Sequence, residues 1–140
     1  MKKVLTLVAV LAVSACATTP VDTIRAKNIA PERVLAYAEP RDDYARVEII
    51  RDVGFTGGGC YIGVMFRNTV LARFDQGEKA VFYLPDGNWK FAVVPDPAGR
   101  GLCGIGGYDP VFETQSIRKD RDNLFRISFG PYRRPRLLPM

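Results

Sequence analysis

Three cysteines and the lack of histidine limit the chemistry available to this chain. The 140 residues include Cys16, Cys60 and Cys103 and contain no histidine. Ser-His-Asp and Cys-His catalysis are therefore excluded, because each needs an imidazole base. A structural zinc site made only of cysteine needs four thiolates, one more than the chain has. We expect neither a metal site nor a cofactor, and we expect that the protein is not an enzyme.

Cys16 ends a segment that is typical of exported proteins. Lys2 and Lys3 give a basic start, and the apolar run at residues 4–13 is shorter than the roughly 20 residues that span a bilayer. Val13-Ser14-Ala15-Cys16 resembles the bacterial lipobox, whose cysteine receives a diacylglyceryl group. We predict a lipoprotein signal peptide at residues 1–15 and lipidation of Cys16. The alternative is an ordinary signal peptide that happens to end before a cysteine.

The residue after Cys16 and the charge balance indicate a location. Bacterial lipoproteins that stay in the inner membrane often carry Asp at this position, and here it is Ala17. We therefore expect the outer membrane, on its periplasmic face, with the acyl chains as the membrane anchor. Removal of Lys2 and Lys3 leaves 18 basic against 15 acidic side chains, a net charge of +3. This weak charge and the exported address both argue against a nucleic acid partner.

Cys60 and Cys103 remain as an even pair after Cys16 is assigned to the lipid anchor. In an oxidising compartment two such cysteines are expected to form a disulfide. In the chain-entropy model this bond stabilises the fold by about 4 kcal/mol. A redox-active or metal-binding pair is the alternative, but the sequence has no CxxC spacing to support it.

Alternation with a period of two predicts short strands along most of the mature chain. Gly, Pro and Asp clusters such as Pro85-Asp86-Gly87 separate them. The predicted strands are Ala45–Arg51, Cys60–Arg67, Thr69–Phe74, Lys79–Leu84, Asn88–Val94, Tyr108–Ile117 and Asn123–Phe129.

This pattern predicts an all-β fold, an antiparallel β-sandwich of about seven strands at residues 41–130, of the transthyretin or immunoglobulin kind. A small barrel is the alternative. Residues 16–40 are expected to form a lipidated tether and a short helix at Pro31–Ala38, because Pro31 suits a first helical turn and Pro40 ends it. Residues 131–140 are expected to be an irregular basic tail.

Two glycine-rich loops hold the candidate binding residues. Arg51 and Asp52 precede Gly57-Gly58-Gly59, and Arg100 lies in the loop that contains Cys103. A binding site for an anionic group would use these arginines and would form a concave pocket at this end of the domain. The alternative role for Arg51 and Asp52 is an ion pair or a turn hydrogen bond that fixes the loop. Exposed tyrosines offer a second possible binding surface, made of Tyr61, Tyr83 and Tyr108.

The segment Arg51-Asp52-Val53-Gly54-Phe55-Thr56-Gly57-Gly58-Gly59-Cys60-Tyr61 resembles a group of small Gram-negative lipoproteins of unknown function. The resemblance continues through Phe82-Tyr83-Leu84-Pro85-Asp86-Gly87 and Gly101-Leu102-Cys103, and it covers most of residues 34–129. More distantly, the layout is similar to periplasmic transthyretin-like sandwich domains. The resemblance implies a lipidated, exported β domain with paired cysteines, and it brings no catalytic residues.

Three functional hypotheses follow from these observations. The first is a non-enzymatic lipoprotein that acts as a structural or protein-interaction module of the cell envelope. The second is an accessory lipoprotein subunit of an envelope-spanning secretion machine, which rests on fold analogy. The third is a protein that binds a small ligand or an envelope polymer at the glycine-rich loops.

Overall fold

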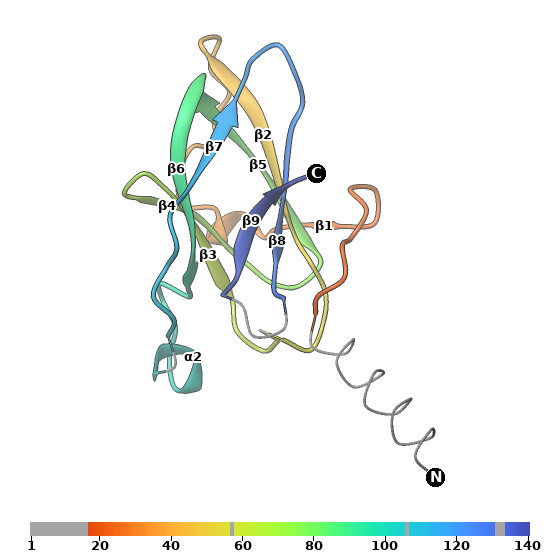
Figure 1. Ribbon diagram of the computed structural model, residues 1–140, viewed down its shortest axis with the longest axis vertical. Helices are drawn as coiled ribbons and strands as arrows, with labels where there is room; N and C mark the ends of the chain where they lie inside the picture. The colour runs from red at the N-terminus through yellow and green to blue at the C-terminus, as the bar shows by residue number, and fades with distance from the viewer. Residues whose placement is uncertain (1–16, 57, 106, 131–133) are drawn as a thin grey trace, which may run out of the picture.

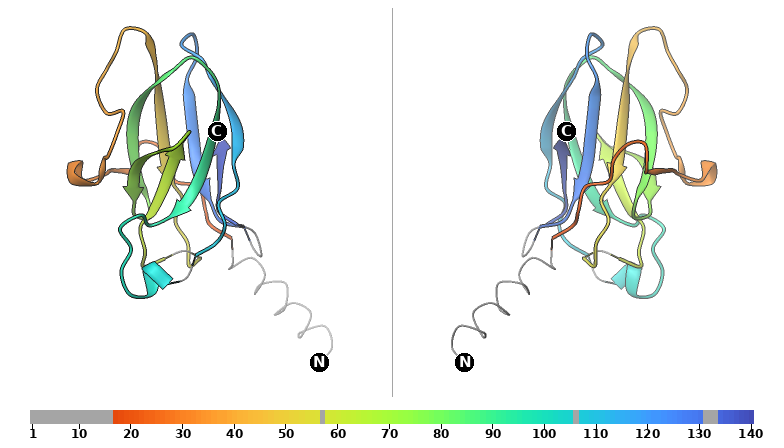
Figure 2. Two further views of the ribbon diagram at one scale, coloured as in Figure 1. Left: turned by 90° about the vertical axis from the view of Figure 1, so that its left-hand side faces the viewer. Right: turned by 90° about the vertical axis from the view of Figure 1, so that its right-hand side faces the viewer.

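The strands of this protein form two sheets that pack face to face (Figures 1 and 2). The structure is a computed structural model, and it describes residues 17–56, 58–105, 107–130 and 134–140. The predicted signal peptide at residues 1–15 and the predicted lipidation site Cys16 lie outside the described residues. The described part of the chain contains no helix long and apolar enough to cross a membrane.

The first sheet has the strand order β1-β5-β2-β8-β9 and the second has the order β4-β3-β6-β7. The bounds in the first sheet are β1 Lys27–Asn28, β2 Tyr44–Arg51, β5 Glu78–Pro85, β8 Asn123–Ser128 and β9 Arg136–Pro139. Those in the second are β3 Ile62–Phe66, β4 Thr69–Phe74, β6 Gly87–Pro95 and β7 Glu113–Ile117. A 3-10 helix, η1 (Pro31–Arg33), and a single helical turn, α2 (Leu102–Ile105), complete the described elements.

The predicted all-β fold is confirmed, and each of the seven predicted strands overlaps one of the strands β2 to β8. Alternation is the reason for this success. In β8, for example, Phe125 and Ile127 are buried, while the alternate residues Leu124 and Arg126 are partly exposed. Successive side chains of a strand point to opposite faces, so one face is free to join the core.

The sequence predicts an antiparallel sandwich, but two of the described strand pairs are parallel. β2 pairs with β8 in parallel, with Val47 opposite Asn123 and Ile49 opposite Phe125, and β1 pairs with β5 in parallel. The chain reaches β8 from β7 in the other sheet, so no hairpin turn forces it to run against β2.

The predicted helix at Pro31–Ala38 is replaced by the three-residue 3-10 helix η1. Val34 already has extended backbone angles and bridges to Ala72, and the N–H groups of Leu35 and Ala36 both donate to the carbonyl of Leu71. These N–H groups therefore form hydrogen bonds with the edge strand β4, whereas in a longer helix they would have bonded to carbonyls of the helix itself.

Both ends of the domain are more ordered than the predicted tether and tail. The backbone of Thr19 bridges to Val53, and Ile29 is buried. At the other end, β9 forms from part of the expected irregular tail and pairs with β8, because Leu137 fills a place in the core. Of the predicted tail, residues 131–133 lie outside the described residues.

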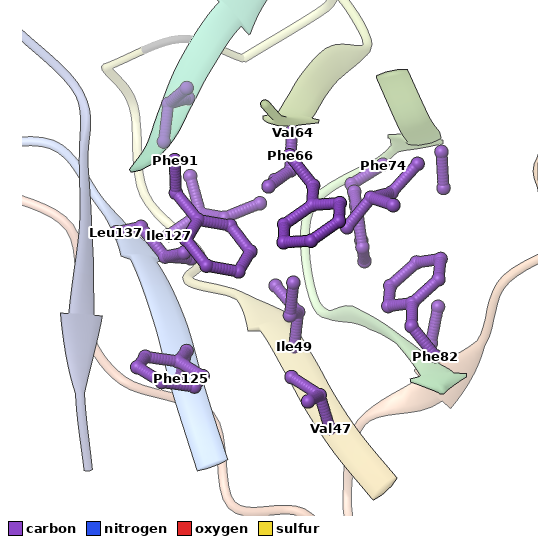
Figure 3. Packing of buried hydrophobic residues seen from close by; sticks show 14 of the residues in the cluster. Val47, Ile49, Val64, Phe66, Phe74, Phe82, Phe91, Phe125, Ile127 and Leu137 are labelled. Atoms are coloured by element: carbon purple, nitrogen blue, oxygen red, sulfur yellow. The ribbon is translucent and has the colours of Figure 1, made fainter. Parts of the chain in front are cut away.

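The core between the sheets is rich in aromatic side chains (Figure 3). Phe91 of β6 stacks with Phe125 of β8 at a centroid distance of 6.3 Å, and Phe74 of β4 meets the edge of Phe82 of β5 at the same distance. Aromatic pairs in these geometries contribute about 0.5–1.5 kcal/mol beyond the burial of their area. The packed core fixes the ends of β2, β3 and β6, from which the candidate site is built.

Candidate functional site at the disulfide end

Two loops meet at one end of the sandwich and are joined by a disulfide. The first loop, residues 52–61, connects β2 to β3, and the second, residues 96–112, connects β6 to β7. Cys60 and Cys103 are bonded, with their Cα atoms 5.6 Å apart and 43 positions apart in sequence. The predicted disulfide is therefore confirmed.

Close backbone packing in the second loop brings Cys103 to its partner. A Cβ atom at Gly99 would lie 2.4 Å from the carbonyl oxygen of Cys103, so this position accepts only glycine without a shift of the backbone. Gly101 has a φ of +58°, the left-handed region that glycine occupies readily. Two of the glycines that mark this loop in the sequence thus shape the turn that carries Cys103.

Arg51 is a buried support for the first loop and does not face solvent. Its residue is only 1% exposed, and Nη1 donates to the carbonyl oxygens of Cys60 at 2.8 Å and Phe74 at 2.7 Å. Burial lowers the pKa of this guanidinium. The contact with Cys60 holds the backbone beside the disulfide, so Arg51 acts as a fixing residue, and it is not among the residues that line the hollow described below.

Asp52 faces a different set of partners from Arg51. Its Oδ2 atom accepts hydrogen bonds from Nη2 of Arg126 at 2.7 Å and from the hydroxyl of Thr18 at 3.0 Å. Burial raises the pKa of this carboxyl, and the hydrogen bonds from Thr18 and Arg126 partly offset that rise. Neighbouring residues at the end of a strand point to opposite sides, which explains why Arg51 and Asp52 do not pair with each other.

Thr18 fixes the first described residues to this end of the sheet. Its backbone N–H donates to the carbonyl of Phe129, and its hydroxyl oxygen accepts a hydrogen bond of 2.9 Å from the N–H of Phe129. Thr19 and Val53 exchange two backbone hydrogen bonds beside it. We call Thr18, Asp52, Arg126 and Phe129 the N-terminal clamp. No local sequence pattern indicates this clamp, because its members are up to 111 positions apart.

A hollow of about 560 Å³ lies beside the disulfide. Its lining includes both cysteines, Tyr61, Arg73, Asp96 and the third predicted site residue, Arg100. Arg100 is exposed, and no described residue forms an ion pair with its side chain. The loops therefore do form a concave surface, and of the predicted residues Arg51, Asp52 and Arg100 only Arg100 lines it.

Tyr61 is the centre of a charged stack at the edge of this hollow. The guanidinium of Arg33 lies 4.6 Å from the centroid of its ring and that of Arg73 lies 4.9 Å from it. Each arginine is also held by two hydrogen bonds to a carboxylate, Arg33 by Glu78 and Arg73 by Asp96, at distances of 2.6–2.8 Å. The stack joins η1, the end of the β2–β3 loop, β4, β5 and the start of the β6–β7 loop.

The carboxylates of this stack are ionised acceptors. The hydrogen bonds from Arg73 lower the pKa of Asp96 against the effect of burial. Burial opposes the ionisation of Glu78, but the hydrogen bonds from Arg33 and from the backbone of Asp75 outweigh it and lower the pKa. Both groups are thus unsuited to donate a proton near neutral pH, and the hollow offers fixed charges and an aromatic rim for binding.

The three tyrosines considered as a binding face do not gather on one surface. Tyr61 and Tyr108 lie in the two loops of the disulfide end, and burial raises the pKa of Tyr108. Tyr83 lies in β5 of the first sheet, where it pairs with Arg46 of β2. All three are partly buried.

A second and larger hollow, of about 760 Å³, lies elsewhere on the first sheet. It is bordered by residues 119–124 and by charged side chains of β2 and β5, including Glu48 and Lys79, which lie 3.8 Å apart. Among the described residues there is no group of three or more His, Cys, Asp or Glu side chains arranged to hold a metal ion.

Comparison of the chain with protein families, with curated proteins and with solved structures finds no match.

Proposed function

We propose that this chain is a non-enzymatic lipoprotein, anchored through acylated Cys16 to the periplasmic face of the outer membrane, where its sandwich acts as an interaction module. The N-terminal clamp is the observation that carries the proposal. Thr18 follows Cys16 by two residues, a reach of at most about 7 Å, so the domain begins directly at the anchor. A start of this kind suits a domain that works at the membrane surface.

The disulfide supports an exported location. A bond between Cys60 and Cys103 suits an oxidising compartment and not a reducing cytosol. The lipobox-like segment Val13-Ser14-Ala15-Cys16 supports the proposed lipid anchor at Cys16. The resemblance to small Gram-negative lipoproteins, and the more distant likeness to transthyretin-like domains, belong to the same proposal.

The first test is the mass of the mature N-terminus, with fractionation of the cell membranes. We expect a chain that begins at acylated Cys16 and is recovered in the outer membrane. The Cys16→Ser variant should lack the acyl mass and leave that fraction. A mature chain without acyl groups, or one that fractionates with the inner membrane, would contradict the proposal.

Crosslinking in intact cells, followed by affinity capture, tests the interaction role. A stoichiometric envelope protein that is captured by the wild type and lost with Cys16→Ser would support an interaction module. If the captured proteins are components of a secretion apparatus, the alternative of an accessory secretion lipoprotein takes first place.

One observation favours a ligand-binding role as the second candidate. The hollow beside the disulfide contains the exposed Arg100 next to the rim formed by Tyr61 and Arg73. These groups suit an anionic small molecule or a charged segment of an envelope polymer. Calorimetric titration with envelope glycan fragments and inorganic phosphate, on wild type and Arg100→Gln, tests it. Equal or absent binding by the two proteins would rule out this role.

A further inference from the structure

Three large apolar side chains stand out from the disulfide end of the sandwich. Phe55 is 93% exposed, Leu102 is 90% exposed and Ile105 is 82% exposed. We call these three residues the apolar tip. Side chains of this size gain free energy when they leave water, and soluble surfaces seldom collect them on neighbouring loops.

The covalent structure keeps the apolar tip together. Phe55 lies in the β2–β3 loop, while Leu102 and Ile105 lie in α2 on either side of Cys103. The disulfide from Cys103 to Cys60 ties α2 to the loop that carries Phe55. Both segments lie at the same end of the molecule in all the views of Figures 1 and 2.

The first described residues lie at this same end. A Cβ atom at Gly54, the residue before Phe55, would lie 3.1 Å from the Cα atom of Thr18. Thr18 is held there by the N-terminal clamp. Only Ala17 separates it from Cys16, so acyl chains on Cys16 would begin within about 7 Å of a point beside Phe55.

We propose that the disulfide end is a membrane-contacting surface, and that the apolar tip inserts into the outer part of the phospholipid layer that holds the anchor. This inference rests on the proposed acylation of Cys16. The anchor brings the surface to the lipid, and the clamp prevents the domain from turning away. Insertion of the tip then buries apolar area that the sandwich itself leaves in water.

The charges near the apolar tip do not favour one lipid class. Arg100 and Arg134 are exposed at this end, and so are Asp75 and Asp109. Arg134 donates a hydrogen bond to the carbonyl of Asp109, which places it beside the β6–β7 loop. Contact with lipid should therefore depend on the apolar side chains and change little with salt.

Depth-dependent fluorescence quenching tests the proposal on the full, lipidated protein. Phe55→Trp would be purified in detergent and reconstituted into phosphatidylcholine vesicles with or without lipids brominated near the headgroup. Ile24→Trp is the matched control, because Ile24 is 88% exposed and lines the other hollow, beside residues 119–124. Wild type supplies the signal of the native Trp89.

A tryptophan inserted about 5–10 Å into the interface lies close to the bromine atoms, so its emission should fall clearly. We expect this loss at position 55, unchanged in concentrated salt, and none at position 24 or in wild type. Equal quenching at positions 55 and 24 would overturn the proposal. Near-UV circular dichroism and the mass of the intact disulfide would confirm that both variants are folded.

The mass of the N-terminus separates this inference from the proposed function. If Cys16 carries no acyl group, the proposed function fails, and the membrane-contacting surface falls with it. If Cys16 is acylated and Phe55→Trp is not quenched, the lipoprotein proposal stands and this inference alone is wrong. A photocrosslinker at position 55 that links to a protein in cells, with no quenching in vesicles, would assign the apolar tip to a protein partner.

Discussion

The hydroxyl of Thr18 donates a hydrogen bond to the carboxylate of Asp52 across 3.0 Å, joining the second residue after Cys16 to the residue that follows β2. Asp52 is only 2% exposed and Thr18 is half-buried, so this bond is partly shielded from solvent. Arg126 binds the same carboxylate oxygen from β8. The segment expected to be a tether is thus already fixed to the sandwich at Thr18.

The first prediction concerns this bond. Thr18→Val keeps the shape of the side chain and removes the hydroxyl, leaving Asp52 and the N–H of Phe129 each without one partner. We expect the free energy of unfolding to fall by about 1–3 kcal/mol, the cost of leaving buried polar groups unpaired. Urea denaturation measures it.

Thr23→Val is the matched control for Thr18→Val. The hydroxyl of Thr23 donates an exposed hydrogen bond of 3.4 Å to Asp22, and the hydrogen bond that the backbone carbonyl of Thr23 accepts from Lys79 does not involve the side chain. Loss of the hydroxyl should therefore change the stability by less than about 0.5 kcal/mol. Equal effects of the two substitutions would show that the N-terminal clamp does not stabilise the domain.

The second prediction concerns Arg51. Arg51→Met fills a similar volume but leaves the carbonyls of Cys60 and Phe74 without the donor that Nη1 provides. We expect a loss of about 2–4 kcal/mol by urea denaturation, since the buried acceptors lose a charged donor. Arg46→Met, at an arginine whose side chain is 58% exposed, should cost less than about 1 kcal/mol. A near-neutral Arg51→Met would contradict the fixing role.

The third prediction concerns the disulfide. The double variant Cys60→Ser, Cys103→Ser should lose about 4 kcal/mol of stability, because the unfolded chain regains the freedom of a loop of that length. The strands do not depend on the bond, so the far-UV circular dichroism should stay that of a β protein. A destabilisation equal to that caused by reduction of the wild type would show that the thiols have no other role in the fold.

The fourth prediction is a pH dependence that arises from Asp96. Its pKa in the folded protein is lowered from the ordinary value of 3.8, chiefly by hydrogen bonds from Arg73. Ionised Asp96 therefore adds stability above pH 3.8, and this contribution is lost as the pH falls through the lowered pKa. Asp96→Asn should be less stable than wild type by about 1 kcal/mol at neutral pH, and the difference should disappear toward pH 2.

Asp43→Asn provides the comparison for Asp96→Asn. Arg41 and Asp43 also form two hydrogen bonds, but the side chains are 56% and 65% exposed. We expect no measurable change in the unfolding free energy of this variant at any pH. If the gap between wild type and Asp96→Asn is constant with pH, the Arg73 pair is not its cause.

The sequence predicted the parts of the fold that depend on neighbouring residues. Alternation of apolar and polar side chains indicated the strands β2 to β8, since one face of each strand must enter the core. The number and compartment of the cysteines indicated the bond between Cys60 and Cys103. The glycines near Arg100 indicated the loop that carries Cys103. Each of these signals lies within a few neighbouring residues or in the number of cysteines in the chain.

Tertiary structure decided which distant side chains meet. Arg51 and Asp52 are adjacent in sequence, yet one binds the backbone of Cys60 and the other binds Thr18 and Arg126. The parallel pairing of β2 with β8 places Arg126 and Phe129 near Thr18, and no local pattern encodes that pairing. Strand order, and not sequence distance, also sets which segments share an end of the sandwich, and it brings Thr18 beside Gly54.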